Sequence, residues 1–490
     1  MDNQCIIQFF EWNLPPDALL WQRAEAQARN LRNLGFDIIW LPPAYKGARG
    51  VRDAGYGVYD LYDLGEFDQK GGVPTKYGTR EEYLKAIKSL QKAGLSVLVD
   101  IVLNHRMGAD ETEKVQAVKD NPENREQEVG GERQIEAWTK YTFPGRKGKY
   151  SDFVWDWTCF TGIDWDEKKE EGGVFQFEGK DWSEEVAEEK GNFDYLMGAD
   201  VDMNNEKVVK ELVRWGKWYL DTTGADGFRL DALKHIEYSF YEKWLDAARK
   251  KADEDLFAMG EYWSGDVEEL LGYLDNCGRR MSLFDVALHM HFRDASQSGG
   301  GYGMQGLFAD TLVERDTLHA VTFVDNHDTQ PGQALESWVE EWFKPLAYAA
   351  ILLRRDGLPC VFYADLYGLR SDGVPPVPGL RRMLAARKLC AYGEQHDYFD
   401  HEHVVGWTRE GDKDHEHSGC AVLMTDKDAG EKTMYVGKQQ AGQAFRDITR
   451  REWDPVVIGE DGNGTFKVPG GGVSVYVRPE MYREIGVNWE

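Results

Sequence analysis

The chain is short of basic residues and has no long apolar run. Its 58 Lys and Arg stand against 86 Asp and Glu, a formal net charge of −28. Such a surface repels phosphate backbones and anionic lipid headgroups. No stretch approaches the roughly 18 consecutive apolar residues that a membrane-spanning helix needs. We therefore expect no nucleic-acid partner and no membrane partner for this 490-residue chain, whose length suggests several domains.

The sequence also lacks paired cysteines and an export signal. Its six cysteines are scattered without C-x-x-C spacing, which indicates reduced thiols rather than a disulfide framework or a zinc site. The first residues, MDNQCIIQFFEW, contain no basic region followed by an apolar run and a cleavage site. We therefore expect a cytoplasmic protein, although a mature secreted form would begin in the same way.

Aromatic residues, in contrast, are plentiful. The chain has 17 Trp, 23 Tyr and 22 Phe. Flat aromatic faces with polar edges suit sugar rings, while ordinary packing in the core accounts for most of them.

Short apolar runs alternate with helix-like stretches over the first 390 residues. Helical patterns cover residues 19–34, 80–93 and 206–221. Eight runs have the composition of buried strands: 5–10, 37–41, 95–102, 227–230, 256–260, 281–284, 320–324 and 360–363. Eight strands separated by helices predict an α/β fold, a (β/α)₈ TIM barrel.

Two segments depart from this alternation. Residues 104–205 are rich in Trp and Gly with strand-like pieces, which predicts an inserted β-rich domain after the third strand. Beyond about residue 392, short β-prone runs separated by turn residues predict a C-terminal antiparallel β-sandwich domain over 393–490. The barrel then comprises residues 1–103 and 206–392.

Three carboxylates follow predicted barrel strands, whose C-terminal ends face the active site in folds of this type. Asp231 ends GADGFRLD, Glu261 follows LFAMG, and Asp328 ends AVTFVDNHD. Any one of them could be a solvated loop acid or a helix cap. Three at equivalent positions indicate a catalytic group.

The neighbours of two of these acids suggest opposite protonation states. Side chains two apart on a strand point the same way, so Arg229 and Asp231 should project together, and the guanidinium would keep Asp231 ionised. Burial and like charge would favour a protonated Glu261. One ionised and one protonated acid form a glycosidase pair, whereas a structural ion pair at the barrel rim is the alternative for Arg229 and Asp231.

Other polar residues follow the strands nearby. His105 follows the third strand in DIVLNHR, and His327 precedes Asp328. A lone histidine is more often structural, but neutral imidazoles paired with carboxylates could hold sugar hydroxyls. Tyr56, in GYGVYDLYDLGEF, could stack on the ring or simply pack in the core beside Tyr59.

Four motifs in order resemble the conserved regions of the α-amylase family, glycoside hydrolase family 13. They are DIVLNHR (100–106), GFRLDALKH (227–235), GEYW (260–263) and FVDNHD (323–328). Together with QFFEW, GYGVYDLYDLGEF and FDYLMGADVDM, they make the chain most similar to liquefying bacterial α-amylases and their intracellular relatives. The resemblance covers essentially the whole chain.

The resemblance implies a role for each acid. Asp231 would be the nucleophile that forms a glycosyl intermediate, Glu261 the general acid and then base, and Asp328 a stabiliser of the oxocarbenium-like transition state. For a retaining mechanism the carboxyls of Asp231 and Glu261 should lie about 5 to 5.5 Å apart. The remaining implied substrate-binding residues are Tyr56, His105, Arg229 and His327 at the cleaved bond, and Lys234, His235 and Trp263 on the leaving-group side.

The resemblance also implies a Ca²⁺ site made of hard oxygen ligands. Its ligands would be Asn104, Asp194, Asp200 and the backbone carbonyl of His235. Without the resemblance, Asp194 and Asp200 read as turn acids.

The chain departs from its bacterial relatives around further metal sites. Thr161, Ser183 and Asn204 stand where those enzymes have acids, so we expect one calcium rather than a metal cluster. A further calcium near Gly300 and Tyr302 is disfavoured, because the expected His and Asp are replaced by Glu402 and His403.

The sequence thus predicts a monomeric endo-acting α-1,4-glucan hydrolase acting on starch, glycogen or maltooligosaccharides. An α-glucan transglycosylase, in which a sugar hydroxyl replaces water, is the alternative within the same chemistry. A catalytically inactive glucan-binding protein is a remote third reading, because all three acids are present.

Overall fold

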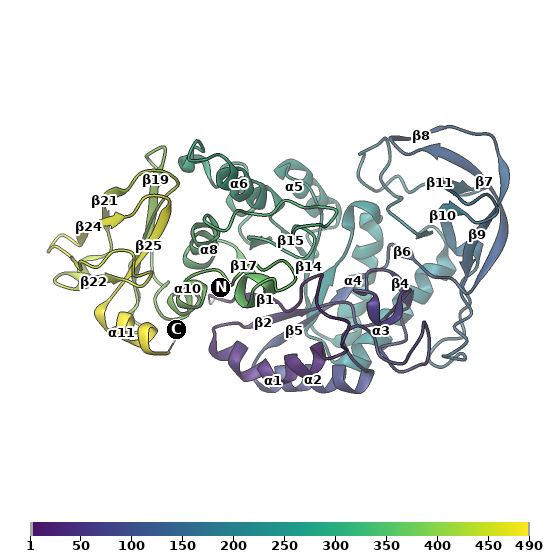
Figure 1. Cartoon of the computed structure of the whole chain (residues 1–490), viewed down its shortest axis with the longest axis horizontal. Helices are drawn as coiled ribbons and strands as arrows, with labels where there is room; N and C mark the ends of the chain where they lie inside the picture. The colour runs from purple at the N-terminus through teal and green to yellow at the C-terminus, as the bar shows by residue number, and fades with distance from the viewer. Residues whose placement is uncertain (1–2, 489–490) are drawn as a thin grey trace.

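A closed barrel of eight parallel strands lies at the centre of the molecule (Figure 1). The structure is a computed structural model that describes residues 3–488. Around the barrel the strand order is β1-β17-β16-β15-β14-β13-β5-β2. The strands are β1 (Ile6–Gln8), β2 (Ile38–Leu41), β5 (Ser96–Ile101), β13 (Gly227–Leu230), β14 (Phe257–Gly260), β15 (Ser282–Phe284), β16 (Ala320–Phe323) and β17 (Leu358–Phe362). The predicted TIM barrel is confirmed.

Helices of the expected period cover the barrel. They are α1 (Leu20–Asn33), α2 (Arg80–Lys92), α3 (Glu206–Thr223), α4 (Tyr238–Ala252), α5 (Val267–Asn276), α6 (Val286–Gln297), α7 (Leu312–Arg315), α8 (Lys344–Leu353), α9 (Tyr363–Tyr367) and α10 (Leu380–Leu389). A capping box of Thr79 and Glu82 starts α2, and Gly224, with φ 61°, ends α3 in a left-handed conformation that glycine adopts readily. Within residues 3–488, no helix is both long and apolar enough to cross a membrane.

An antiparallel sheet inserted after β5 forms one end of the molecule (Figure 1). Its order is β6-β12-β10-β11-β7-β8, and β9 pairs with β7. The strands are β6 (His105–Arg106), β7 (Glu111–Asn121), β8 (Asn124–Glu128), β9 (Arg133–Lys140), β10 (Phe160–Asp166), β11 (Glu171–Phe177) and β12 (Ala199–Val201). The predicted inserted β-rich fold is thereby confirmed.

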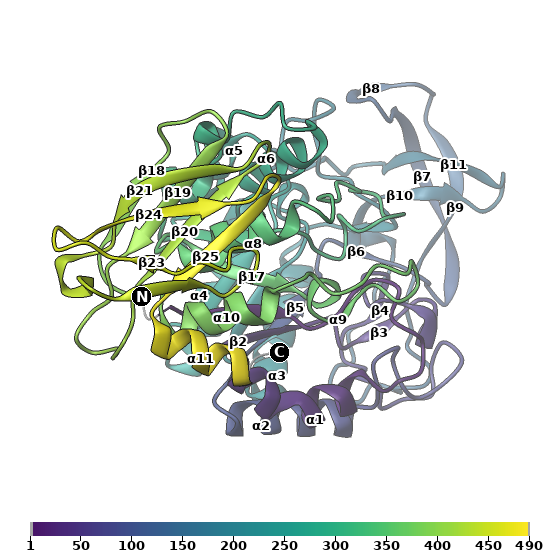
Figure 2. The same cartoon turned by 60° about the vertical axis from the view of Figure 1, so that its left-hand side comes forward.

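The opposite end of the molecule is an antiparallel β structure (Figures 1 and 2). Its larger sheet contains β18 (Gln395–Tyr398), β19 (Val404–Arg409), β20 (Cys420–Thr425), β25 (Gly472–Val477), β22 (Ala444–Asp447) and β23 (Val456–Val457). Its smaller sheet pairs β21 (Gly430–Tyr435) with β24 (Asn463–Val468). A separate apolar core, which includes Leu423, Phe445 and Phe466, lies between them. Helix α11 (Pro479–Asn488), which the sequence did not predict, packs against α10 and β22 (Figure 2).

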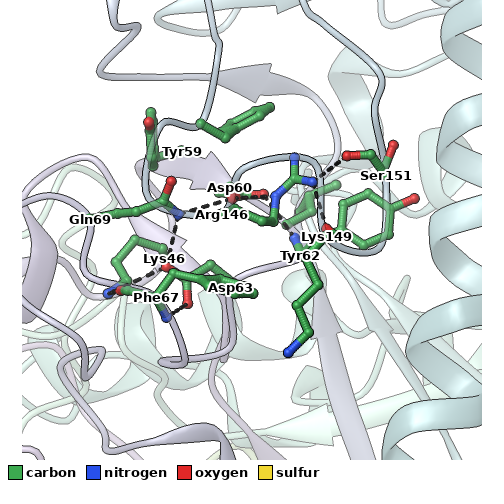
Figure 3. A network of polar contacts seen from close by, with 12 residues as sticks. Lys46, Tyr59, Asp60, Tyr62, Asp63, Phe67, Gln69, Arg146, Lys149 and Ser151 are labelled. Atoms are coloured by element: carbon green, nitrogen blue, oxygen red, sulfur yellow. Dashed lines mark hydrogen bonds and ion pairs between the residues drawn. The ribbon is translucent and has the colours of Figure 1, made fainter.

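A buried polar network joins the inserted sheet to the loop that follows β2 (Figure 3). Arg146, from the insertion, donates to Asp60 at 2.8 Å. The amide of Gln69 donates to Asp60 and to Asp63 at 3.0 Å each, and the ammonium of Lys46 lies 3.5 Å from Asp63. Because these groups are shielded from water, they hold the loop in one arrangement.

Candidate active site

The three predicted acids converge at the C-terminal mouth of the barrel. Asp231 directly follows β13, and Glu261 directly follows β14. The backbone N–H of Asp231 donates to Ile101 at 3.0 Å, and that of Glu261 to Leu230 at 2.9 Å, so the barrel ladder fixes where both side chains start. Asp328 lies on the loop after β16.

A fully buried arginine connects two of these acids. The Nη1 of Arg229 lies 2.7 Å from Asp231 and 3.0 Å from Asp100, and its Nη2 contacts Glu261. The sequence placed Arg229 beside Asp231, as observed. It did not foresee that the same guanidinium also contacts Glu261.

Asp328 has an environment different from that of the other two acids. Burial, with the charges of Asp231 and Asp100, raises its pKa to about 7, although Arg229 acts in the opposite direction. Its Oδ2 lies 3.2 Å from Nε2 of His327. Burial and Arg229 lower the pKa of His327 well below the ordinary value, so this imidazole is neutral.

The residues predicted to bind the sugar at the cleaved bond lie together around Tyr56. Its hydroxyl donates to Asp100 at 2.9 Å, and its carbonyl lies 2.8 Å from Nε2 of His105. The Tyr56 ring stacks on His327, with centroids 4.9 Å apart and planes at 17°. Trp12 lies nearly parallel to both rings, with its centroid 5.8 Å from that of Tyr56 and 6.0 Å from that of His327. The Tyr56 ring thus packs against Trp12 and His327, and it also borders the main apolar core.

The residues predicted for the leaving-group side follow two of the acids in the chain. Lys234 and His235 come after Asp231, and Trp263 comes after Glu261. The ammonium of Lys234 contacts Glu189. The Nδ1 of His235 lies 2.6 Å from the carbonyl of Phe193, and burial lowers the pKa of His235 to about 3. Trp263, partly buried, packs near His289 with ring centroids 5.8 Å apart.

Asp100 was not predicted as a site residue, although it begins the motif DIVLNHR. It is fully buried, and its carboxylate accepts from Arg229, Tyr56 and, at 2.9 Å, the indole N–H of Trp40. Burial raises the pKa of Asp100 to about 6 against the opposing effect of Arg229. Its position, five residues before His105 inside the predicted strand, gave the signal: an acid in a buried strand needs partners.

The proposed calcium ligands also converge, next to the mouth of the barrel. In the pairing of β12 with β6, Asp200 lies opposite His105, and Val201 donates to the carbonyl of Asn104 at 2.9 Å. The bond between the His235 ring and Phe193 brings the segment before Asp194 to the same place. These contacts bring segments separated by more than a hundred positions together, and the carboxyl groups of Asp194 and Asp200 are near enough to influence each other's pKa.

This cluster has the electrostatics of a cation site. Burial raises the pKa of Asp194 to about 7, and burial and the charge of Asp194 raise that of Asp200. Within residues 3–488, Oδ2 of Asp200 is buried without a hydrogen-bond partner. Two buried carboxylates with an unsatisfied oxygen fit a hard divalent cation.

Two of the residues at which the sequence departs from its relatives, Ser183 and His403, contact nearby carboxylates. The backbone N–H of Ser183 donates to Oδ2 of Asp194 at 2.9 Å. In the C-terminal domain, Nδ1 of His403 lies 3.0 Å from Asp426.

A pair of partly exposed tryptophans lines a cavity of about 410 Å³ on the inserted sheet, next to β6. The indole N–H groups of Trp138 and Trp165 both donate to one carboxylate oxygen of Glu167, at 3.0 and 2.9 Å. Arg106 and Tyr141 line the same cavity. Both rings are thereby held in place with more than a third of their surface exposed. The many aromatic residues of the insertion were the only signal in the sequence.

Comparison with known proteins agrees with this geometry. Residues 27–375 match the α-amylase catalytic domain model. The chain is 53% identical to an α-amylase of Geobacillus stearothermophilus, over 97% of this chain and 87% of that protein. It is 44% identical to the cytoplasmic α-amylase of Escherichia coli, over 98% of this chain and all of that protein. The α-amylase of Geobacillus thermoleovorans, solved with acarbose, shares the fold at a TM-score of 0.62 and 16% identity, covering 97% and 98% of the two chains. The chain belongs to the α-amylase family.

Proposed function

We propose that the protein is an α-amylase that hydrolyses internal α-1,4-glucosidic bonds of starch, glycogen and maltooligosaccharides by a retaining double displacement. The observation that carries this proposal is the convergence of Asp231, Glu261 and Asp328 at one barrel mouth, two of them on a single buried guanidinium. The family membership and the 50% identity to the α-amylase of Bacillus licheniformis support it.

In the first step, a carboxylate oxygen of Asp231 attacks the anomeric carbon while Glu261 gives its proton to the leaving glycosidic oxygen. A covalent glycosyl ester on Asp231 results. In the second step, Glu261 takes a proton from water, the water oxygen attacks the same carbon, and the ester bond breaks. Two inversions leave the α configuration unchanged.

The other residues hold the reacting sugar and its partial charge. Asp328 faces the positive charge that develops at the anomeric centre, as electrostatic stabilisation requires. Tyr56 and His327 provide a flat wall for the ring. Arg229 would act through the carboxylates of Asp231 and Glu261, and His105 would hold the backbone of Tyr56 in place. Lys234, His235 and Trp263 would contact the glucose units of the leaving group.

The tryptophan pair would bind the substrate farther along the glucan chain. Trp138 and Trp165 present fixed, partly exposed rings on the inserted sheet, whose strand β6 contains His105. Stacked sugar rings would use this surface, so we propose that it binds glucose units of longer substrates away from the cleaved bond.

We also propose one structural calcium held by Asn104, Asp194, Asp200 and the carbonyl of His235. When bound, calcium would supply positive charge that neutralises two buried carboxylates and would join the inserted sheet to the barrel. The buried Oδ2 of Asp200, which lacks a partner among residues 3–488, supports this ligand set.

A cytoplasmic location is proposed as well. The similarity to a relative named as cytoplasmic, over that protein's whole length, supports it. So do the six cysteines, which are all free and buried. Cell fractionation with an activity assay tests this location.

The products of soluble starch and maltoheptaose test the proposed activity. Hydrolysis would release new reducing ends from soluble starch, with a rapid loss of long chains, and NMR would show the α-anomer first. Redistribution of chain lengths without new reducing ends would instead establish a transglycosylase. Initial release of the β-anomer would contradict the retaining mechanism.

A further inference from the structure

Gln8 is a buried polar side chain at the C-terminal end of β1, and the mechanism above gives it no role. It is 1% exposed. In the barrel register it lies between Trp40 of β2 and Phe362 of β17. Its amide nitrogen lies 3.1 Å from Nδ1 of His327. A buried amide among apolar neighbours is costly unless it makes a specific hydrogen bond.

This contact determines where the proton of His327 lies. The imidazole is neutral because burial and Arg229 lower its pKa, so only one ring nitrogen carries hydrogen. The amide N–H₂ of Gln8 can only donate, which makes Nδ1 the acceptor. The proton is then on Nε2, which lies 3.2 Å from Oδ2 of Asp328.

The ring has no other freedom to exchange the two nitrogens. Tyr56 stacks on one face at 4.9 Å, Trp12 lies at 6.0 Å with planes at 15°, and Phe10 packs at 5.0 Å. Trp40 contacts the ring edge-on at 5.7 Å. With the ring held on these sides, the two nitrogens keep their places, and their partners select the tautomer: Gln8 at Nδ1 and Asp328 at Nε2.

We propose that Gln8 is a positioning residue of the active site: its amide N–H fixes the Nε2–H tautomer of His327, so that His327 donates a hydrogen bond to Asp328. This donor holds the carboxylate of Asp328 where charge develops in the reaction. A reversed amide would do the opposite, because Nδ1–H would donate to Gln8 and Nε2 would accept from a protonated Asp328. The effect on turnover rests on the proposed function, while the tautomer itself does not.

The tautomer can be read directly by NMR of the full chain, with calcium added and histidine labelled with ¹⁵N. The His327→Gln variant identifies the signals of His327 by their absence. We expect a protonated Nε2 and an unprotonated Nδ1. A proton on Nδ1 would overturn the proposal. Since no substrate is involved, this result is independent of whether the protein hydrolyses α-glucans.

Three variants test the consequence for the reaction. Gln8→Met keeps the shape but removes the donor, and Gln8→Glu replaces the donor by an acceptor that favours Nδ1–H. Gln440→Met is the matched control, because Gln440 is a buried glutamine of the C-terminal domain that donates to Glu410 and Ser418. Kinetics use a blocked maltoheptaoside with a chromogenic leaving group.

We expect Gln8→Met to lower kcat about tenfold with less than a twofold change in KM. The reason is that the oriented hydrogen bond from Nε2–H of His327 to the Asp328 carboxylate is lost. Gln8→Glu should lower kcat further and move the NMR proton to Nδ1. Gln440→Met should leave kcat unchanged. Wild-type kcat in both Gln8 variants, or an unmoved proton in Gln8→Glu, would overturn the proposal. Should Gln8→Met fail to fold, the wild-type spectrum and Gln8→Glu still decide it.

Discussion

Asp231 and Glu261 contact the same guanidinium, yet the proposed mechanism gives them different tasks. Asp231→Asn removes the nucleophile and Glu261→Gln removes the proton donor, and each replacement keeps the side-chain shape. We expect each variant to lower kcat on soluble starch by about 10³-fold or more, because each group acts along the reaction coordinate. Circular dichroism should show an unchanged fold. If either variant kept a tenth of wild-type turnover, the assigned role would be wrong.

The pKa of Asp328 makes a second prediction, about stability. Burial raises this pKa to about 7 from an ordinary value near 3.8. The folded state therefore holds the proton more tightly than the unfolded state. The resulting stabilisation is present at pH 4 and is lost as the pH rises through 7. Asp328→Asn carries no ionisable group, so its Tm relative to wild type should increase between pH 5 and pH 8.

Calorimetry at several pH values, with calcium in excess, measures this difference. Asp428→Asn, on the surface of the C-terminal domain, is the control for loss of one negative charge. A Tm difference that is the same at pH 5 and pH 8 would contradict the raised pKa of Asp328.

The acids of this site could be predicted from the sequence, but the buried polar residues that hold their neighbours in place could not. Asp231, Glu261 and Asp328 could be predicted because each follows a recognisable strand. Asp100 and Gln8 lie inside strands, where a polar residue reveals nothing about its partner until the barrel brings distant strands together. Gln8 and His327, which are 319 positions apart, form a contact that no local pattern shows.

At the level of elements, the strands were the easiest to predict. All eight barrel strands lie within about two residues of the expected ranges, since buried apolar runs between helices are distinctive. Helix α11 was missed because its sequence, PEMYREIGVN, is short and follows a run of strands. The domain boundaries at 103/104, 205/206 and 392/393 stay predictions, which limited proteolysis would locate.

The link between the inserted sheet and the loop after β2 should depend on Arg146. Its pair with Asp60 is 2.8 Å long and almost fully buried. Arg146→Met leaves a buried carboxylate unpaired, which costs about 3–5 kcal/mol. We expect faster proteolysis within residues 104–205, monitored by mass spectrometry. Lys140→Met is the control in the same sheet, because its pair with Glu111 is exposed and worth under about 1 kcal/mol. Equal cleavage rates in the two variants would contradict the prediction.

The tryptophan pair gives a prediction that depends on substrate length. Trp138→Ala removes an exposed ring that the proposed function assigns to distant glucose units. We expect kcat/KM on soluble starch to fall about tenfold, the value of one stacking contact of about 1.4 kcal/mol, with little change on maltotriose. Trp453→Ala, an exposed tryptophan of the C-terminal domain, is the control. An equal loss on both substrates would show that Trp138 acts through the fold instead.

For the whole molecule, the arrangement in Figure 1 places the barrel between the insertion and the C-terminal sheets. The proposed calcium ligands lie where the insertion meets the barrel, since Asn104 follows β5 and Asp200 belongs to β12. A ligand that binds only the folded state stabilises it by mass action. The monomeric state stays a prediction.

Calcium should therefore raise Tm, and a chelator should lower both Tm and activity. Without the ion, Asp194 and Asp200 are two neighbouring buried carboxyl groups, and burial raises the pKa of each. We expect the rim beside His235 to loosen before the barrel unfolds, so hydrogen exchange after chelation should increase first in residues 190–205. Asp200→Asn should reduce the calcium-dependent rise in Tm more than Asp202→Asn, because Asp202 already has Lys180 as its partner. A Tm unaffected by chelator, together with no calcium in the purified protein, would mean that Asp194 and Asp200 serve only as turn residues.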